Sequence, residues 1–453
     1  MRRRRGDGER HGMPRRVSAA RRPGLLPRIV AVVASALVAV TALAGCATGD
    51  VAAGARFVTS PLVRYSAVLW PFPLELVGAE PGARLRLTAR LATAHGTWTS
   101  AATYTVPASG TLDLAAARPQ LAPFTEPDSA GLFWTLRGPQ LSGEAAARQW
   151  MRDTIRVTVA ASDAGRVVAS RSFELDGLAS SLAVRTIYTR DLRPAIDPRL
   201  PRQTHEDVAL ATFYSAASLE HPQTPVVLMF DDARPGASGD YVAPVIAQFG
   251  ASVLRIPVAA AADGVRSTGI VADTTVQAVF DWLSERPDIE QDRVYVYGTG
   301  AAEQLAVWAA TRFPSRIHGL FVAGGAPALL CLPAARVAPV FEDSSGLPCL
   351  TDAETVVPSA VPSIDGVDGP VVLACGTQDA TLPSSCAWQR ALAATREPRP
   401  GDRTIYADGA THPVSVPPGL PIALPATGGQ PTEKARIAFW NAVGRDLLRA
   451  VLG

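Results

Sequence analysis

Beyond its first 45 residues, the chain lacks any block of Lys or Arg, any CxxC spacing and any long polar tract. Without a basic block it offers no footprint for nucleic acid. Without CxxC pairs, or a His beside a Cys, the sequence gives no reason to expect a metal site, and no cofactor motif is present. The composition, 47% hydrophobic and 19% charged, is typical of a globular protein.

An uncleaved transmembrane anchor is one interpretation of the N-terminal segment, but the apolar run Ile29–Gly45 is shorter than the roughly 20 residues that span a bilayer. Ten Arg precede this run, which closes on Leu43-Ala44-Gly45-Cys46. A basic segment followed by an apolar segment and small residues predicts an export signal. We expect a lipoprotein signal peptide over residues 1–45, with Cys46 becoming the acylated N-terminus of a membrane-anchored, extracytoplasmic protein.

Removal of this segment reverses the sign of the charge. The segment carries +8, so that subtraction from the formal +2 of the whole chain leaves the mature 408 residues near −6. Four cysteines remain after Cys46, and an even number outside the cytosol predicts two disulfides. Three pairings of Cys331, Cys349, Cys375 and Cys386 are possible, and the sequential one closes two short loops.

Two sequence patterns divide the mature chain, which is long enough for two domains. After a tether over residues 46–57, short alternating runs such as Arg84–Leu91 and Thr154–Val159 are broken by turn residues such as Pro81-Gly82. This period of two predicts an immunoglobulin-like β-sandwich over residues 58–185.

From residue 186 to 453 the pattern is of continuous apolar strands alternating with helical segments. Pro225–Phe230, Ser252–Ile256, Arg293–Tyr297 and Pro370–Cys375 read as buried parallel strands, and Thr274–Arg286 and Ala301–Phe313 as helices between them. Together they predict a doubly wound, mainly parallel sheet of the α/β-hydrolase type.

The strand ending at Tyr297 leads into Gly298-Thr-Gly-Ala-Ala302 and then a helix, which is the position of a nucleophile elbow. Such a turn needs small residues two before and two after the nucleophile, and Gly298 and Ala302 fit. The residue between them is Gly300, which has no group to attack a carbonyl. A frame with Thr299 as the nucleophile is rejected, because it would place Tyr297 where a small side chain is required.

The other two members of a catalytic triad follow in hydrolase order. Asp379 comes after the strand that ends at Cys375, where such enzymes carry the acid that orients the histidine, and His412 lies in a loop before the last helix. The alternative is that Asp379 caps a loop and His412 is a surface residue.

An oxyanion loop should follow the strand Pro225–Phe230. There the sequence is Asp231-Asp232-Ala-Arg-Pro-Gly236, and two carboxylates would oppose the binding of a developing negative charge. The alternative is that both Asp side chains point to solvent. In either case the loop departs from the Gly-rich form.

These features resemble the acyl-CoA thioester hydrolase and bile-acid-CoA:amino-acid N-acyltransferase family, whose members join a β-sandwich to an α/β-hydrolase domain. The similarity rests on Gly131-Leu-Phe-Trp134 in the sandwich, Gly409-Ala-Thr-His412 near the end, and Phe439-Trp440 in the last helix. By that resemblance Gly300 occupies the position of the nucleophile, while Asp379 and His412 match the family's acid and base.

Three functions remain open at this stage. The first is a non-catalytic descendant that binds an acyl or lipid ligand at the cell envelope. The second is an active ester or thioester hydrolase that uses Asp379 and His412 with a water or with the hydroxyl of Thr299, Ser384 or Ser385. The third is an envelope scaffold whose sandwich binds an unidentified protein partner.

Overall fold

The computed structural model describes residues 54–59, 73–178, 182–192, 209–233, 238–258, 271–331, 337, 339–343, 345–419 and 429–453. Cys46 and the predicted signal peptide lie outside them, as do Arg234, Pro235 and Gly236. Residues Gly54–Gly453 form one compact unit. No helix in the described ranges is long and apolar enough to cross a membrane.

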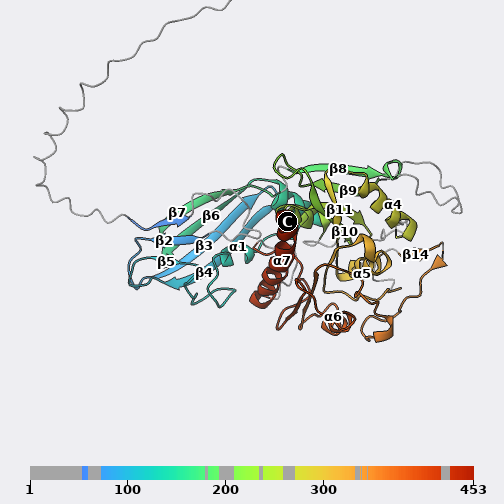
Figure 1. Ribbon diagram of the computed structural model, residues 1–453. Helices are drawn as coiled ribbons and strands as arrows, with labels where there is room; N and C mark the ends of the chain where they lie inside the picture. Colours follow the sequence, from blue (N-terminus) through green and yellow to red (C-terminus); the bar gives the residue numbers. More distant parts are fainter. Residues whose placement is uncertain are drawn as a thin grey trace, which may run out of the picture. The chain divides into compact units, whose positions relative to one another are not determined.

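Two antiparallel sheets build the N-terminal region (Figure 1). One has the order β4-β3-β6-β7, and its strands are Gly96–Thr105, Arg84–Thr93, Ile155–Asp163 and Arg166–Leu175. The other has the order β1-β2-β5, with strands Arg56–Thr59, Leu74–Val77 and Leu112–Asp113. The alternation of buried and exposed residues along β3 is the predicted period of two, and Leu85, Leu87 and Leu91 point into the core.

Short helical segments lie between β5 and β6 of this region, and one more follows residue 188. The string Gly131-Leu-Phe-Trp forms α1 (Gly131–Trp134), and all four of its residues are buried. Gly131 has to be glycine, since a Cβ there would lie 2.4 Å from the Phe124 ring. Further along the chain are α2 (Gly143–Ala147), the π-helical turn η1 (Arg148–Arg152) and η2 (Thr189–Asp191).

An eight-stranded sheet forms the second region, with the order β17-β16-β13-β12-β10-β11-β9-β8. In chain order its strands are Ala183–Tyr188, Ala209–Ser215, Thr224–Asp231, Ser252–Pro257, Ile289–Thr299, Gly319–Ala323, Val371–Gly376 and Arg403–Ala407. β9 is the one strand of this sheet that runs in the opposite direction to the other strands. This order and direction are those of the α/β-hydrolase fold, so the predicted fold class is confirmed.

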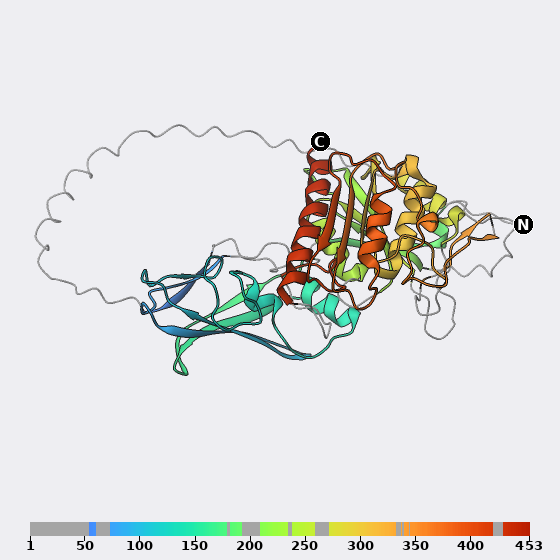
Figure 2. The same cartoon turned by 90° about the horizontal axis from the view of Figure 1, so that it is seen from below.

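Helices cover both faces of this sheet (Figures 1 and 2). On one face, α4 (Asp273–Ser284), α5 (Glu303–Arg312) and α6 (Ser385–Ala393) share a core with alternate strand residues such as Val296 and Leu373. On the other, α3 (Gly239–Ala247) and α7 (Gly429–Leu452) pack on the intervening residues, and that core continues into the sandwich. Strands buried on both faces explain the continuous apolar runs.

The long segment between β13 and β16 contains little regular structure. It includes the two-stranded ribbon β14 (Phe341–Glu342) and β15 (Ser345–Gly346) and the single turn η6 (Pro358–Ala360), while η4 (Pro314–Arg316) precedes β13. The disulfide Cys331–Cys349 closes part of this segment. A second disulfide, Cys375–Cys386, joins the end of β16 to α6, so that the pairing is the sequential one.

Removal of the second disulfide should destabilise the protein. Because its loop spans 11 residues, the chain-entropy estimate for Cys375→Ala with Cys386→Ala is a loss of about 3 kcal/mol in the free energy of unfolding. Urea unfolding of the purified mature chain measures the loss, and peptide mapping without reduction tests the pairing. An unchanged unfolding midpoint, or a peptide joining Cys375 to Cys331 or Cys349, would contradict this structure.

Candidate functional site

The predicted site residues lie at one edge of the eight-stranded sheet. Gly300 follows β12, Asp379 follows β16 and His412 follows β17, and these strands are parallel. The loop after β10, which begins at Asp231, opens at the same edge. The carboxyl edge is where open parallel sheets of this kind hold their ligands.

The turn after β12 is tight and centres on Gly300. Its φ of +56° lies in the left-handed region, whereas Thr299 is still extended, at −132°, as the last residue of β12. A Cβ on Gly298 would lie 2.6 Å from the carbonyl oxygen of Ala302, so that only glycine fits there. The single turn η3 (Gly300–Ala302) then leads into α5. The geometry is that of a nucleophile elbow whose central residue is glycine.

Two consecutive glycines after β13 bring the elbow and the histidine together. A Cβ on Gly325 would lie 2.1 Å from the carbonyl oxygen of Gly300, and one on Gly324 would lie 3.7 Å from Cε1 of His412. The Cβ at position 325 would clash with that backbone oxygen, whereas 3.7 Å at position 324 is an ordinary van der Waals distance. The backbone at 324–325 therefore touches both the empty nucleophile position and the histidine ring.

Asp379 and His412 form a hydrogen-bonded pair. Nδ1 of His412 lies 2.8 Å from Oδ2 of Asp379, and the two side chains are 18% and 0% exposed. The other carboxylate oxygen, Oδ1, accepts hydrogen bonds from the backbone N–H groups of Thr381 (2.8 Å) and Leu382 (2.9 Å). Asp379 therefore does cap its loop, as in the alternative reading, and it also orients the histidine.

The electrostatics of Asp379 favour the ionised form. Burial raises the pKa of the carboxyl, but the hydrogen bond and charge of His412 and the two backbone N–H groups lower it by more, so the net pKa lies below its ordinary value. An ionised carboxylate favours the tautomer of His412 that carries its proton on Nδ1.

The loops that carry the pair are locked together. A Cβ on Gly376 would lie 2.4 Å from the carbonyl oxygen of Ala410, which also accepts a hydrogen bond from Gln378 N–H at 2.9 Å. The disulfide Cys375–Cys386 closes the segment that includes Asp379. The close backbone contact between the two loops and the disulfide together fix the position of Asp379 relative to His412.

One face of α7 holds the histidine loop from the other side. Thr432 Oγ1 accepts a hydrogen bond from Thr411 N–H (2.9 Å), Arg436 Nε donates to Pro413 O (3.0 Å) and Trp440 Nε1 donates to Ser415 O (2.9 Å). These three side chains recur every four residues, so they share a helix face. The sequence reasoning missed them, although a buried Arg in an amphipathic helix is itself a signal for a polar contact.

The loop after β10 differs from both interpretations of its sequence. Asp231 does not point to solvent, because its side chain is 1% exposed and accepts a hydrogen bond from Arg255 Nε at 2.5 Å. Its other oxygen accepts the backbone N–H of Ala233 at 2.8 Å, and Ala233 adopts a φ of +57°. The negative charge of Asp231 is therefore neutralised by Arg255. Its carboxylate also accepts the backbone N–H of Ala233, in the loop that is expected to supply an N–H group to an oxyanion.

Arg255 is held in its charged form by this arrangement. Burial lowers the pKa of its guanidinium, but the charges of Asp231 and Asp240 raise it by more, so the net pKa is above the ordinary value. Asp232 is half-buried beside the pair.

The first turn of α5 contributes two buried polar side chains that the sequence reasoning also missed. The carboxylate of Glu303 accepts hydrogen bonds from the backbone N–H of Gly325 (2.8 Å) and from the side-chain amide of Gln389 (2.5 Å). The side-chain oxygen of Gln304 accepts a hydrogen bond from the backbone N–H of Leu330 (2.9 Å). Both side chains hold the segment after β13 over the elbow. An acid and an amide in an otherwise apolar helix were the signals that could have found them.

The hydroxyl groups considered as substitute nucleophiles are buried or already hydrogen-bonded within the protein. Ser384 donates to the carbonyl oxygen of Ala353 at 2.8 Å, and Ser385 is fully buried at the start of α6. Thr299 ends a buried strand. Across the described ranges there is no group of three or more His, Cys, Asp or Glu side chains that could hold a metal ion.

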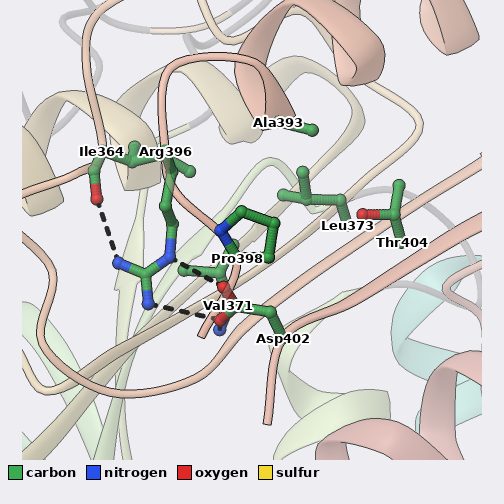
Figure 3. Close-up of a pocket in the computed structure, with 8 residues that line it drawn as sticks. All are labelled: Ile364, Val371, Leu373, Ala393, Arg396, Pro398, Asp402 and Thr404. Atoms are coloured by element: carbon green, nitrogen blue, oxygen red, sulfur yellow. Dashed lines mark hydrogen bonds and ion pairs between the residues drawn. The ribbon is translucent and has the colours of Figure 1, made fainter. Parts of the chain in front are cut away.

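A small cavity of about 80 Å³ lies at the opposite end of β16 and β17 (Figure 3). It is lined by Val371 and Thr404, near the starts of these strands, and by Arg396. The guanidinium of Arg396 donates to Asp402 and to backbone carbonyl groups, including that of Gly369. The cavity is thus a structural feature of the amino edge and no part of the candidate site.

Comparison with known proteins confirms the resemblance found in the sequence. Residues 70–186 match the family described as the acyl-CoA thioester hydrolase/BAAT N-terminal region. No curated protein sequence matches the chain. Residues 70–186 are therefore similar to the N-terminal region of that family, and the strands that follow them form an α/β-hydrolase fold.

Several solved structures are similar over part of the chain. A dienelactone hydrolase from Anabaena variabilis is 18% identical, with a TM-score of 0.34, and the match covers 57% of this chain and 95% of that one. An esterase from Mycobacterium marinum is 16% identical, with a TM-score of 0.38, covering 60% and 84%. Est1E from Butyrivibrio proteoclasticus is 14% identical, with a TM-score of 0.34, covering 54% and 95%.

The pKa of Asp379 makes a prediction for stability. The pKa of this carboxyl is lower in the folded state than in the unfolded state. Its ionised form therefore stabilises the fold at any pH above the unfolded-state pKa, and this stabilisation is lost as the pH falls through the folded-state pKa. Asp379→Asn should therefore lower the free energy of unfolding by about 1–3 kcal/mol near pH 7, and its deficit should shrink as the pH falls below about 4. Urea unfolding across this pH range measures the deficit, with the exposed Glu285→Gln as control. A deficit that is the same at every pH would contradict the assignment.

Proposed function

We propose that the chain is a non-catalytic member of the acyl-CoA thioester hydrolase family, anchored outside the cytoplasm through Cys46, that binds an acyl or lipid ligand at the carboxyl edge of its sheet. The observation that carries this proposal is the glycine at the centre of the elbow. Catalysis by acyl transfer begins with a nucleophile at that point. In a serine protease, loss of that serine lowers turnover on the order of a millionfold.

The loop after β10 supports the same conclusion independently. An oxyanion hole stabilises the developing charge with N–H groups that are free to donate. The N–H of Ala233 is already bound to Asp231. Two parts of the acyl-transfer machinery are thus altered, while the acid and base are kept.

The binding role follows from what remains. The ring of His412 is partly exposed, whereas its partner Asp379 is covered, so the histidine can donate or accept a hydrogen bond from a ligand carbonyl or carboxylate. An acyl group is the expected ligand because the family is described by its action on acyl-CoA thioesters.

The predicted location agrees with a changed function. CoA thioesters are cytosolic metabolites, so a protein exported and acylated at Cys46 would not meet them. A ligand of the envelope, such as a lipid or fatty acyl group, would be within reach of the site.

An active hydrolase is the second candidate, and the intact hydrogen bond between Asp379 and His412 favours it. In this version His412 acts as a general base toward a bound water, and no protein nucleophile is needed. The ligand-binding proposal predicts that the wild-type protein does not hydrolyse acyl esters or thioesters.

Gly300→Ser should create hydrolysis of an acyl thioester. The new hydroxyl would lie at the centre of the elbow, at the same edge of the sheet as His412, and a positioned general base contributes about 10²-fold or more to the rate. Release of the free thiol from a short-chain thioester measures the rate in wild type and variant.

The matched control is Gly300→Ala, which imposes the same strain at φ +56° without a hydroxyl. It should lower stability by about 1 kcal/mol and give no hydrolysis. His412→Ala in the Gly300→Ser background should remove the new activity. Robust hydrolysis by the wild-type protein that His412→Ala abolishes would contradict the binding proposal and support the second candidate.

The lipid anchor has its own test. Cys46→Ala should prevent acylation, so that the protein loses the added mass of the acyl chains that supply the anchor energy. The intact mass of wild type and variant, each purified from membranes, checks this result. A wild-type protein without acyl mass on Cys46, or the same added mass in the variant, would contradict anchoring at Cys46.

A further inference from the structure

The outward side of the four-stranded sheet β4-β3-β6-β7 is basic. Along β3 the side chains alternate, and Arg84, Arg86 and Arg90 are exposed while the leucines between them are buried. Arg156 of β6 and Glu174 of β7 are paired on the same side. We call this surface the outer sheet face.

The charge of the outer sheet face is not a property of the whole domain. Residues 73–178 contain ten Arg and ten acidic residues, so the domain is neutral. The outer sheet face holds four of these Arg and only one acid, Glu174. In the described part of the chain, no acidic side chain forms an ion pair with Arg84, Arg86 or Arg90. The positive charge is therefore separated onto one side of the sandwich.

Short side chains surround these arginines. Arg86 lies between Thr103 of β4 and Ser162 of β6, and Arg90 lies between Thr99 and Thr158. Directly paired residues of neighbouring strands project to the same side of a sheet. The long guanidinium groups therefore stand above a level surface of hydroxyl and methyl groups, where a flat partner can reach several of them at once.

Two exposed apolar side chains border the same row of residues. Leu121, 67% exposed, pairs with Thr103 at one edge, and Val167, 58% exposed, pairs with Ser162 at the other. Cationic side chains beside exposed aliphatic ones suit the boundary between lipid headgroups and acyl chains.

We propose that the outer sheet face docks on the anionic phospholipid headgroups of the bilayer that holds the lipid anchor. This inference rests on the proposed acylation of Cys46. Arg56, the first residue of β1, lies ten residues after Cys46, and an extended chain of that length spans at most about 35 Å. The sandwich is thus the part of the protein kept nearest the membrane, and the mature chain, near −6 overall, would be repelled by anionic lipid unless a basic surface faced it.

Vesicle co-sedimentation tests the proposal on a protein without acyl groups, so the anchor does not mask the effect. The chain from Ala47 retains the whole compact unit Gly54–Gly453. It should bind vesicles made of equal parts phosphatidylglycerol and phosphatidylcholine more tightly than vesicles of phosphatidylcholine alone, and the difference should vanish at high salt. Arg84→Gln with Arg86→Gln and Arg90→Gln should weaken partition to the anionic vesicles on the order of a hundredfold.

The matched control removes three exposed arginines that lie off the outer sheet face, namely Arg148, Arg445 and Arg449, each changed to Gln. It carries the same net charge as the test variant and should bind like the wild-type chain. Equal loss in both variants, no preference for anionic vesicles, or binding to heparin without binding to vesicles would each overturn the proposal. Acylation of Cys46 is read separately from the mass of the exported protein, and hydrolysis from the Gly300 variants, so failure of one proposal does not imply failure of the other.

Discussion

The turn after β12 is the constraint on which the rest of the site depends. It forces the backbone to reverse within Gly298–Ala302, and the side-chain space at Gly298 and Gly325 is already filled by neighbouring backbone or side-chain atoms. The central residue must adopt a positive φ, which a Ser or Cys holds at a cost and Gly300 holds without strain. Proteins retain such backbone strain where catalysis needs the strained side chain. A glycine at this position avoids the strain, which agrees with the proposed site that binds a ligand and does not react with it.

The retained acid–base pair has a structural explanation that does not require catalysis. Asp379 caps its own loop through two backbone N–H groups and bonds His412, and the loops are locked by Gly376 and a disulfide. Loss of either partner would leave a buried polar group unsatisfied, at a cost of about 1–3 kcal/mol. In the proposed non-catalytic protein, the pair can therefore persist because it stabilises the fold.

Much of this arrangement can be predicted from the sequence, because it depends on local pattern and chain order. The elbow follows from small residues at fixed spacing between a buried strand and a helix, and the positions of Asp379 and His412 follow from the strand order of the fold. Strand and helix ends shift by a few residues, as with β12, which extends from Ile289 to Thr299 instead of Arg293–Tyr297. End positions depend on tertiary contacts that no local pattern encodes.

Contacts between distant segments could not be predicted in the same way. The partner of Asp231 is Arg255, 24 residues later, and only the presence of an Arg within an apolar strand hinted that an acid must lie beside it. Arg436 of α7 donates a hydrogen bond to the backbone of Pro413 in the loop of His412, and this contact can be seen only in the packed structure. These long-range contacts fix the start of the loop after β10 and the loop that carries His412.

The central claim is that the wild-type site forms no covalent bond with an acyl group. Intact-mass measurement of the wild-type mature chain, after incubation with a fluorophosphonate and separately with an acyl thioester, tests it most directly. We expect the mass of the wild-type protein to be unchanged after incubation with either reagent. A stoichiometric phosphonyl or acyl adduct that disappears in His412→Ala would contradict it, because it would reveal a nucleophile that the elbow at Gly300 does not supply.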